Sequence, residues 1–216
     1  MPQYIHKGLR EGTGRQPELT GREQLIGNAP TEPEAFLLWG AQREREEGKF
    51  ELSRGRVTCN MIYASNHHSR VLKNLVVELG HLLDPDRFDI GISDFAVQTP
   101  CGVRSPDVVV SATAPRRELS TTTPIFIVEV LSPSTAGTDF TEKLQEYTAI
   151  EALQTYLICS QDEPRAWAWA RQGDGSWPRL PIELVGRDDS IALGGLGIEL
   201  ATAAIFRGIP DAPTVE

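Results

Sequence analysis

The run from Ile125 to Leu131 is apolar and rich in β-branched residues, with Glu129 as its single polar position. A strand that faces water on one side alternates polar and apolar residues, and this run does not alternate. The pattern therefore predicts a central strand covered on both faces. An ionised carboxylate buried there without a partner would cost several kcal/mol, so we expect Glu129 to be paired, protonated or bound to a cation.

The N-terminal quarter of the chain has three distinct patterns. Residues 1–30 are polar, contain Gly and Pro and lack periodicity. The next segment, Thr31-Glu32-Pro33-Glu34, is typical of a helix start. A Gly-containing turn at 53–55 then separates the stretches 50–52 and 56–62. The predictions are an extended arm over residues 1–30, a helix from the capping Thr31 to about Glu47 that stops at Gly48, and a hairpin over residues 50–62.

The central part of the chain predicts an α/β core. Apolar residues recur at helical spacing from Val71 to Leu83, after Ser65 as a possible cap. The further elements expected are strands over 92–98, 106–110 and 125–131, a helix from Thr138 or Asp139 to about Glu151 with Asp139 and Glu142 as a capping box, and a strand over 155–159. This order, α-β-β-β-α-β, predicts a mixed sheet with the helices packed over it.

The C-terminal part predicts an extra β layer. Residues 165–171 place Trp167 and Trp169 on one face of a strand, a Gly-rich turn follows at 173–175, and residues 177–180 are expected to return as a second strand. The tryptophans could stack on bases, but packing in the core or at a dimer interface is the favoured interpretation. The extra layer and its strand edges predict a homodimer.

Charge argues against simple electrostatic binding of nucleic acid. The net charge is −9, and residues 1–56 carry nine basic and nine acidic side chains, so the negative excess lies in residues 57–216. Phosphate contacts normally drive nucleic-acid affinity, and a bound metal ion or a local basic patch would offset this charge only in part.

The length allows one domain over residues 31–216 after the arm. No apolar run approaches ~18 residues, and the first residues lack a signal-peptide pattern, so we expect a cytoplasmic protein without a membrane span. Three widely spaced cysteines, Cys59, Cys101 and Cys159, fit structural thiols better than disulfides or a zinc site.

The candidate chemistry lies around the central strand. Asp107 opens the short β run Val108–Val110, and Asp139, Lys143 and Tyr147 share one helix face at i, i+4 and i+8. Two carboxylates on strands, joined by a lysine from the next helix, predict a divalent-metal hydrolase site. Taken alone, Asp107 after a proline is also typical of a turn, and Lys143 of a surface lysine.

Four further residues are auxiliary candidates. Glu51 on the hairpin is either an additional acidic ligand or an exposed strand position, and His67 or His68 at the helix start faces substrate or solvent. Asp139 either pairs with Lys143 or caps its helix. Tyr147 is predicted to be a packing residue whose hydroxyl lies near the site. Motifs of other classes, such as G-x-S-x-G, the Walker A loop and G-x-G-x-x-G, do not occur.

The ordered motifs resemble those of the PD-(D/E)XK nuclease superfamily and, more closely, of the Uma family of putative restriction endonucleases, a domain of unknown function. The resemblance covers roughly Phe50 to Phe206. It rests on F-E-L-S-R-G-R-V from Phe50, His67 or His68, Pro106-Asp107, E-V-L-S-P-S from Glu129, and D-x-x-x-K-x-x-x-Y from Asp139.

The resemblance implies a metal-dependent endonuclease that hydrolyses DNA phosphodiester bonds, with a restriction-endonuclease-like core. It implies Asp107, Glu129 and the carbonyl of Val130 as ligands of Mg²⁺ or Mn²⁺, which prefer oxygen donors. The E-x-K lysine is absent because Leu131 stands two residues after Glu129, and in this family its role points to Lys143. The alternative is a non-catalytic relative that serves as an oligomeric binding module.

Overall fold

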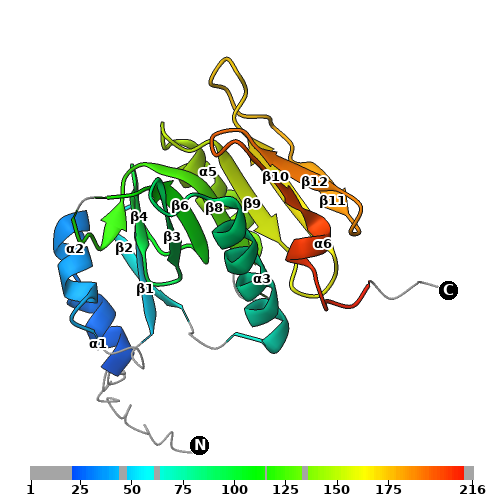
Figure 1. Ribbon diagram of the computed structural model, residues 1–216. Coiled ribbons are helices and arrows are strands. Elements are labelled where there is room, and N and C mark those ends of the chain that lie inside the picture. The colour runs from blue at the N-terminus through cyan, green and yellow to red at the C-terminus, as the bar shows by residue number, and fades with distance from the viewer. Residues whose placement is uncertain (1–20, 44–47, 61–63, 115, 133–135, 212–216) are drawn as a thin grey trace, which may run out of the picture.

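A computed structural model describes residues 21–43, 48–60, 64–114, 116–132 and 136–211. Its centre is a six-stranded mixed sheet in the order β11-β10-β9-β8-β6-β3 (Figure 1). The strands are β3 (Phe88–Ile92), β6 (Val108–Ala112), β8 (Pro124–Val130), β9 (Thr155–Cys159), β10 (Arg165–Ala170) and β11 (Ile182–Val185). The pair β8–β9 is parallel and the other neighbours are antiparallel, as a helical crossover between β8 and β9 requires.

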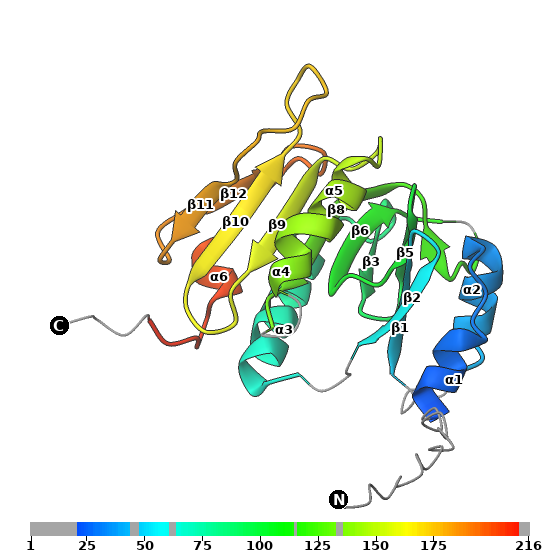
Figure 2. The same ribbon diagram turned by 180° about the vertical axis from the view of Figure 1, so that it is seen from behind.

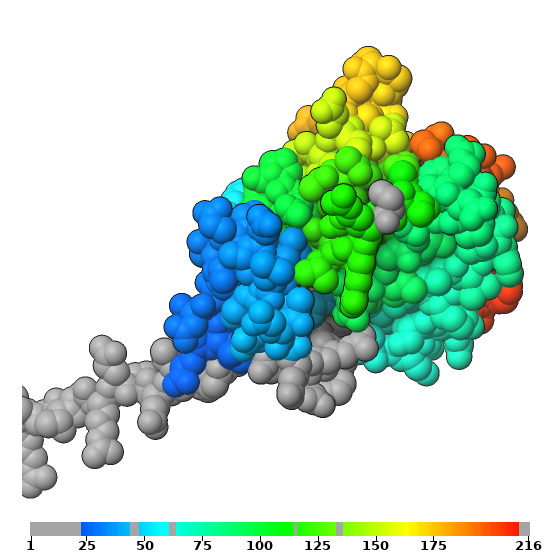
Figure 3. All heavy atoms as spheres, turned by 60° about the vertical axis from the view of Figure 1, so that its left-hand side comes forward, coloured from blue at the N-terminus to red at the C-terminus, as the bar shows by residue number. Residues whose placement is uncertain are grey.

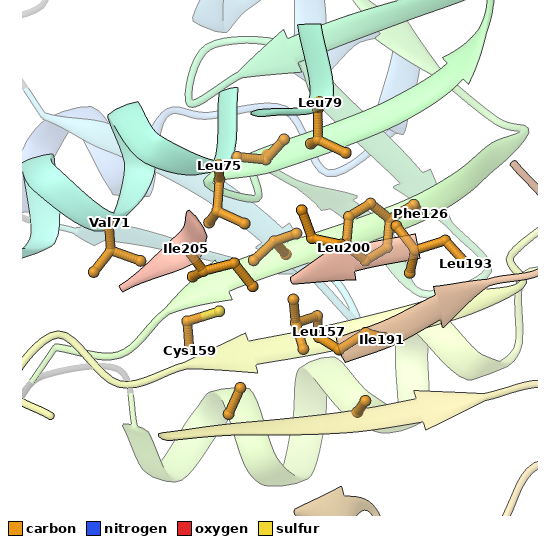
Figure 4. Close-up of a cluster of buried hydrophobic side chains, with 14 of the residues drawn as sticks. Val71, Leu75, Leu79, Phe126, Leu157, Cys159, Ile191, Leu193, Leu200 and Ile205 are labelled. Carbon is orange, nitrogen blue, oxygen red and sulfur yellow. The ribbon is translucent and has the colours of Figure 1, made fainter. Parts of the chain in front are cut away.

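One face of this sheet is covered by α3 (Asn66–Leu82), with α6 (Thr202–Ile205) beside it. The predicted cap is confirmed, because the Ser65 hydroxyl accepts a hydrogen bond from the His68 backbone N–H at 3.0 Å. The apolar stripe of α3 then packs Leu75 against the sheet cluster that contains Phe126 and Leu157 (Figure 4). The hairpin of β12 (Ser190–Leu193) and β13 (Ile198–Ala201) closes the same cluster.

The opposite face is covered by one continuous helical segment (Figure 2). It consists of α4 (Ala136–Thr138), a π-helical turn (Asp139–Lys143) and α5 (Leu144–Thr148). Tyr147 of α5 packs on Ile127, Tyr156 and Trp169 of the sheet. The two faces of the sheet thus have separate cores.

A second, five-stranded sheet stands beside the first, in the order β2-β1-β5-β4-β7. Its strands are β1 (Lys49–Ser53), β2 (Arg56–Asn60), β4 (Ala96–Thr99), β5 (Gly102–Arg104) and β7 (Ser120–Thr121). The helices α1 (Gly21–Gly27) and α2 (Pro33–Gly40) lie on its outer side (Figure 3). The predicted N-terminal hairpin is confirmed as β1 and β2, and it becomes one end of this sheet.

Several sequence-based predictions about the N-terminal region are wrong. Part of the expected extended arm is helix α1, and Ile26 and Ala29 pack on the cluster around Phe36. The second helix ends at Gly40, and its cap is Glu32 rather than Thr31, without a side-chain cap bond. Packing against the cluster around Phe36 determines where these helices lie, and the local sequence pattern alone does not predict it. The remaining predicted helical residues 44–47 lie outside the described residues.

The expected strand over 92–98 is two strands in different sheets. Ile92 ends β3 by pairing with Val108, whereas Ala96 begins β4. Between them Ser93 has a φ of 50°, and its backbone N–H donates to the Asp107 carbonyl at 3.1 Å. The chain turns there because the left-handed backbone of Ser93 breaks the extended conformation.

The expected second strand over 106–110 lies two residues later, since β6 begins at Val108 and extends to Ala112. The strand expected to return over 177–180 is instead β11, which pairs with β10 over Arg165–Ala168. Because β10 and β11 extend the main sheet, the extra C-terminal β layer consists only of the β12–β13 hairpin. No helix in the described ranges is both long and apolar enough to cross a membrane.

Candidate active site

Glu129 lies on the face of β8 that is covered by the π-helical turn and α5. Phe126 and Val128 point into the core beneath α3, whereas Ile127 points into the core beneath α5. Because side chains alternate along a strand, Glu129 shares the face of Ile127. Its side chain is 3% exposed. The prediction of a carboxylate on a strand covered on both sides is therefore confirmed.

Two donors from the covering helix converge on Glu129. The Lys143 ammonium lies 2.9 Å from Oε1 of Glu129, and the Tyr147 hydroxyl donates to the same oxygen at 2.9 Å. Lys143 is itself buried and Tyr147 is fully buried. The helical spacing that placed Lys143 and Tyr147 on one face thus predicted this convergence.

Asp139 completes the group on the helix, but it is not the helix cap. It is fully buried, and its Oδ1 lies 2.9 Å from the Lys143 ammonium. Its backbone carbonyl accepts a hydrogen bond from the Tyr156 hydroxyl at 3.1 Å. The predicted capping box is wrong, because α4 precedes Asp139 and turns the residue towards the lysine instead of the helix start.

Glu51 approaches from the second sheet and is buried, so its interpretation as an exposed strand position is wrong. Its Oε1 accepts from the Ser105 backbone N–H at 3.1 Å and lies 4.0 Å from the Lys143 ammonium. Its Oε2 accepts from Arg104 Nη1 at 3.2 Å. A single ammonium, that of Lys143, therefore faces Glu51, Glu129 and Asp139.

Arg104 and Glu146 form a second ion pair that the sequence analysis missed. Arg104 donates from Nε to Oε2 of Glu146 at 2.7 Å and from Nη2 to Oε1 at 2.8 Å. The Ser53 hydroxyl adds a bond to Glu146 at 2.6 Å. Bidentate pairing of this kind fixes both side chains. The one available signal was that Arg104 directly follows an apolar stretch and precedes Ser105-Pro106-Asp107.

Asp107 lies at the end of β6 next to Glu129. Val108 pairs with Val128, and one position further along this register Asp107 accepts from the Val130 backbone N–H at 2.8 Å through Oδ2. Its other oxygen, Oδ1, lies 3.6 Å from His68 Nε2. Asp107 thus lies in the turn before β6 and also at the site, so the two interpretations of this residue are compatible. His67, by contrast, makes no recorded contact with these acids in the part of the chain that the structure describes.

The pKa shifts follow from one ammonium shared by several carboxylates. Burial raises the pKa of Glu129 from 4.5 to about 8, opposed by Lys143 and assisted by Asp139 and Asp107. Burial alone would lower the pKa of Lys143, but Glu129, Glu51 and Asp139 outweigh it and raise that pKa. Burial would raise the pKa of Glu51, but Lys143, Lys49 and Arg104 lower it.

The buried charges at this site do not balance. The buried carboxylates are Glu51, Glu129, Asp139 and Glu146, and the buried cations are Arg104 and Lys143. Four carboxyl groups and two cations leave an excess of −2 when Glu129 is ionised and of −1 when it holds the proton that its raised pKa favours, and Asp107 with 13% side-chain exposure adds to either. Since an unpaired buried charge is costly, this excess calls for a proton or a cation.

Two carboxylate oxygens are available to a cation. Among the described residues, Glu129 Oε2 makes no hydrogen bond and Asp107 Oδ1 faces His68 Nε2 at 3.6 Å; both are hard oxygen donors of the kind that Mg²⁺ prefers. No set of three His, Cys, Asp or Glu side chains in the described ranges is arranged as a metal site. A metal ion would therefore need main-chain oxygen and water as further ligands, which Mg²⁺ commonly keeps.

Fold and site together define the chain as a mixed α/β protein with a carboxylate–lysine cluster on a covered sheet face. The same fold occurs in a crystal structure of a protein from Anabaena variabilis ATCC 29413, described as "a putative nuclease belonging to DUF820". The two structures share a TM-score of 0.62 at 17% sequence identity, over 79% of this chain and 96% of the other.

The chain belongs to the Uma2 family, described as "Putative restriction endonuclease", whose profile matches residues 33–203. The predicted resemblance is thereby confirmed. Two uncharacterized proteins of Synechocystis sp. (strain ATCC 27184 / PCC 6803 / Kazusa) are similar in sequence. One is 32% identical over 182 residues, which cover 82% of this chain and 92% of that relative. The other is 31% identical over 156 residues, which cover 69% of this chain and 86% of that relative.

Proposed function

We propose that this protein is a divalent-metal-dependent endonuclease that hydrolyses DNA phosphodiester bonds. The observation that carries the proposal is the excess of buried carboxyl groups over cations around Glu129, with Asp107 beside them, which reaches −2 once Glu129 gives up its proton. One divalent cation would offset that excess. Membership of a family described as "Putative restriction endonuclease" supports hydrolysis of nucleic acid as the reaction.

The ligands in this proposal are Asp107, Glu129 and the carbonyl of Val130. Their oxygen donors suit Mg²⁺ or Mn²⁺ better than zinc. When bound, such an ion polarises the phosphoryl oxygen and lowers the pKa of a coordinated water. The hydrogen bond from the Val130 N–H holds one oxygen of Asp107, and the other, 3.6 Å from His68 Nε2, would be the ligand atom.

Lys143 would orient the attacking water or stabilise the negative charge that develops on the phosphate. Asp139 and Glu129 hold its ammonium at 2.9 Å each, and this pairing keeps it protonated. Tyr147 fixes the Glu129 carboxylate by donating to it. His68 Nε2 lies 3.6 Å from Asp107 Oδ1, so this imidazole would orient the Asp107 carboxylate.

Metal binding is the first test. Isothermal titration with Mg²⁺ or Mn²⁺ should show one site in the wild type that Asp107→Ala and Glu129→Ala each abolish. Glu118→Ala, which removes an exposed carboxylate elsewhere, is the matched control. Unchanged binding in both site variants would exclude this ligand assignment.

Catalysis is the second test. The wild type should nick supercoiled plasmid in the presence of Mg²⁺, and Lys143→Ala should not. Lys73→Ala, an exposed lysine on α3, should retain the activity. Equal nicking by both lysine variants would trace the activity to a different site or to a contaminant.

A non-catalytic binding module is the second candidate. It is favoured by the absence of the E-x-K lysine at Leu131 and by the net charge of −9. The plasmid assay separates the two candidates, because a binding module with intact metal binding would leave the plasmid uncut.

We also propose that the protein assembles as a homodimer through β11. This strand ends the order of the main sheet, and Leu180, Ile182 and Val185 on or beside it are 75%, 63% and 66% exposed. An apolar edge strand can pair with its symmetry copy. The tryptophans do not supply this interface alone, because Trp169 is buried in the core.

Light scattering at micromolar concentration should show a dimer that Ile182→Lys converts to monomer. Val77→Lys, at an exposed apolar position of α3, should leave the dimer intact. A wild-type monomer would contradict the assembly.

A further inference from the structure

A cavity of about 310 Å³ lies between α2, β1 and the bend that follows β3. The apolar part of its wall is formed by Phe36, Leu37, Phe50, Ala96, Val103 and Leu119. The rest of the wall is polar and includes Arg43, Lys49, Ser93, Asp94 and Ser105. Figure 3 shows the side of the molecule where the blue helices stand against the green segments that follow β3. The cavity is distinct from the acidic cluster, by which we mean the carboxylates of the candidate active site. None of them lines the cavity: Glu51, Asp107, Glu129, Asp139 and Glu146.

Three segments of the chain join this cavity to the acidic cluster. The backbone N–H of Ser105, which lines the cavity, donates to Glu51 Oε1 at 3.1 Å. The backbone N–H of Ser93, also in the lining, donates to the Asp107 carbonyl at 3.1 Å. Lys49 lies on β1 two residues before Glu51, on the same side of the strand. The same stretch of wall therefore borders the cavity on one side and contacts the acids on the other.

Electrostatics agree with this placement of Lys49. Burial would raise the pKa of Asp107, but His68 and Lys49 outweigh it and lower that pKa. Lys49 also assists in lowering the pKa of Glu51. Its charge thus acts on both carboxylates, and the same residue lines the cavity. A phosphate placed between the two sites would meet this cation.

The size of the cavity and its mixed apolar and polar lining suit a small group with apolar faces and a polar edge. Ligand pockets of roughly 300 Å³ or more bury small molecules among apolar and aromatic side chains, with a few polar groups to fix their orientation. A nucleobase has these properties. Burial of a base would also supply affinity that a chain of net charge −9 cannot gain from phosphate contacts alone.

We propose that this cavity receives one nucleobase of the substrate strand, turned out of the base stack, while its sugar-phosphate backbone passes Lys49 towards the acidic cluster. The inference rests on the proposed nuclease function for the identity of the substrate. It deepens that function by naming the substrate class as nucleic acid with an unpaired or readily unstacked nucleotide. Extruding a paired base costs a few kcal/mol, so a single strand should bind better than a perfect duplex.

The test measures binding with a probe that has only one base. The probe is a hexanucleotide of abasic residues with a single 2-aminopurine, and an all-abasic hexanucleotide of equal charge is its control. Both are titrated against the full chain in Ca²⁺ and followed by fluorescence anisotropy of a terminal dye. The base-containing probe should bind about tenfold more tightly or better, because the all-abasic probe has no apolar ring to bury in the cavity.

Blocking the cavity should remove that difference. Ala41 is exposed and lines the cavity, whereas the exposed neighbour Gln42 does not. Ala41→Trp should therefore bind both probes equally weakly, and Gln42→Trp should behave like the wild type. A shift in 2-aminopurine fluorescence that occurs with the wild type and Gln42→Trp, but not with Ala41→Trp, would place the base in the cavity.

The outcomes separate this inference from the nuclease proposal. Equal affinity of the wild type for the two probes, no binding of either probe, or equal base-dependent binding by the two tryptophan variants would overturn the base pocket. Plasmid nicking combined with any of these results would leave the nuclease proposal standing. Base-dependent binding without nicking in Mg²⁺ would overturn hydrolysis and retain the pocket.

Discussion

The two faces of the six-stranded sheet bury opposite kinds of side chains. Beneath α3 the core consists of aliphatic and aromatic residues, among them Leu75, Phe126 and Leu157, and no buried charge of the described residues lies there. Beneath α5 the sheet carries Glu129, and the covering helix brings Lys143 to it. One strand, β8, serves both faces because its side chains alternate.

The comparison shows where stability and function reside. The apolar face gains free energy from every buried group, since transfer from water and close packing both favour it. The charged face pays a desolvation cost for each ion, and its carboxylates outnumber its cations. A protein keeps such an imbalance where a ligand can correct it, and this is why the charged face is the candidate site.

The largest expected effect on stability comes from removing the shared cation. Lys143→Met leaves Glu129, Asp139 and Glu51 without their common ammonium, so the free energy of unfolding should fall by about 3–5 kcal/mol at neutral pH. Urea denaturation in EDTA measures it. Lys73→Met, at an exposed lysine, is the control, and an equal effect of the two substitutions would refute the buried ion cluster.

A truncation on the apolar face should be nearly as costly. Leu75 is fully buried under α3, and Leu75→Ala should lower the free energy of unfolding by about 2–5 kcal/mol because it removes contacts and leaves a cavity. Metal affinity, measured by titration on the folded variant, should stay unchanged. A loss of metal binding comparable to that of Glu129→Ala would show that the two faces are not independent.

A neutral replacement on the charged face should raise the free energy of unfolding, whereas the two substitutions above lower it. Glu129→Gln keeps an acceptor for Lys143 and Tyr147 but removes the charge. In the folded wild type the pKa of Glu129 is about 8, above its ordinary value of 4.5. The folded state therefore holds a proton that the unfolded chain releases between these values.

The stabilising effect of the Glu129 proton is fully present below pH 4.5 and is lost as the pH rises to 8. Relative to Glu129→Gln, the metal-free wild type should lose about 1.4 kcal/mol of stability per pH unit across this window. Denaturation series in EDTA at several pH values measure the slope. Parallel curves for the two proteins would contradict the raised pKa.

The smallest effect should come from the start of α3. Ser65→Ala removes the cap bond to the His68 N–H and should cost about 1 kcal/mol. Thermal unfolding measures it, with Ser65→Thr as the variant that restores an acceptor. If the Ser65→Ala and Ser65→Thr variants were equally stable, the cap bond would contribute nothing to the stability of α3.

Local pattern was sufficient for part of the site. The acid in an otherwise apolar run predicted a covered strand, and helical spacing predicted that Lys143 and Tyr147 would point the same way. Pattern misled at Asp139, where a capping residue and a buried ion partner have the same local sequence. It also missed Arg104, whose partners Glu51 and Glu146 lie 53 and 42 residues away in the chain.

The sequence by itself determined that Glu129 would be buried, because apolar neighbours on both sides of the strand demand cover on both faces. The tertiary structure alone decided which charges surround it. The second sheet brings Glu51 and Arg104, the π-helical turn brings Asp139, and the end of β6 brings Asp107. Burial is dictated by neighbours along the chain, whereas ionic balance depends on groups that only folding places within a few ångströms of one another.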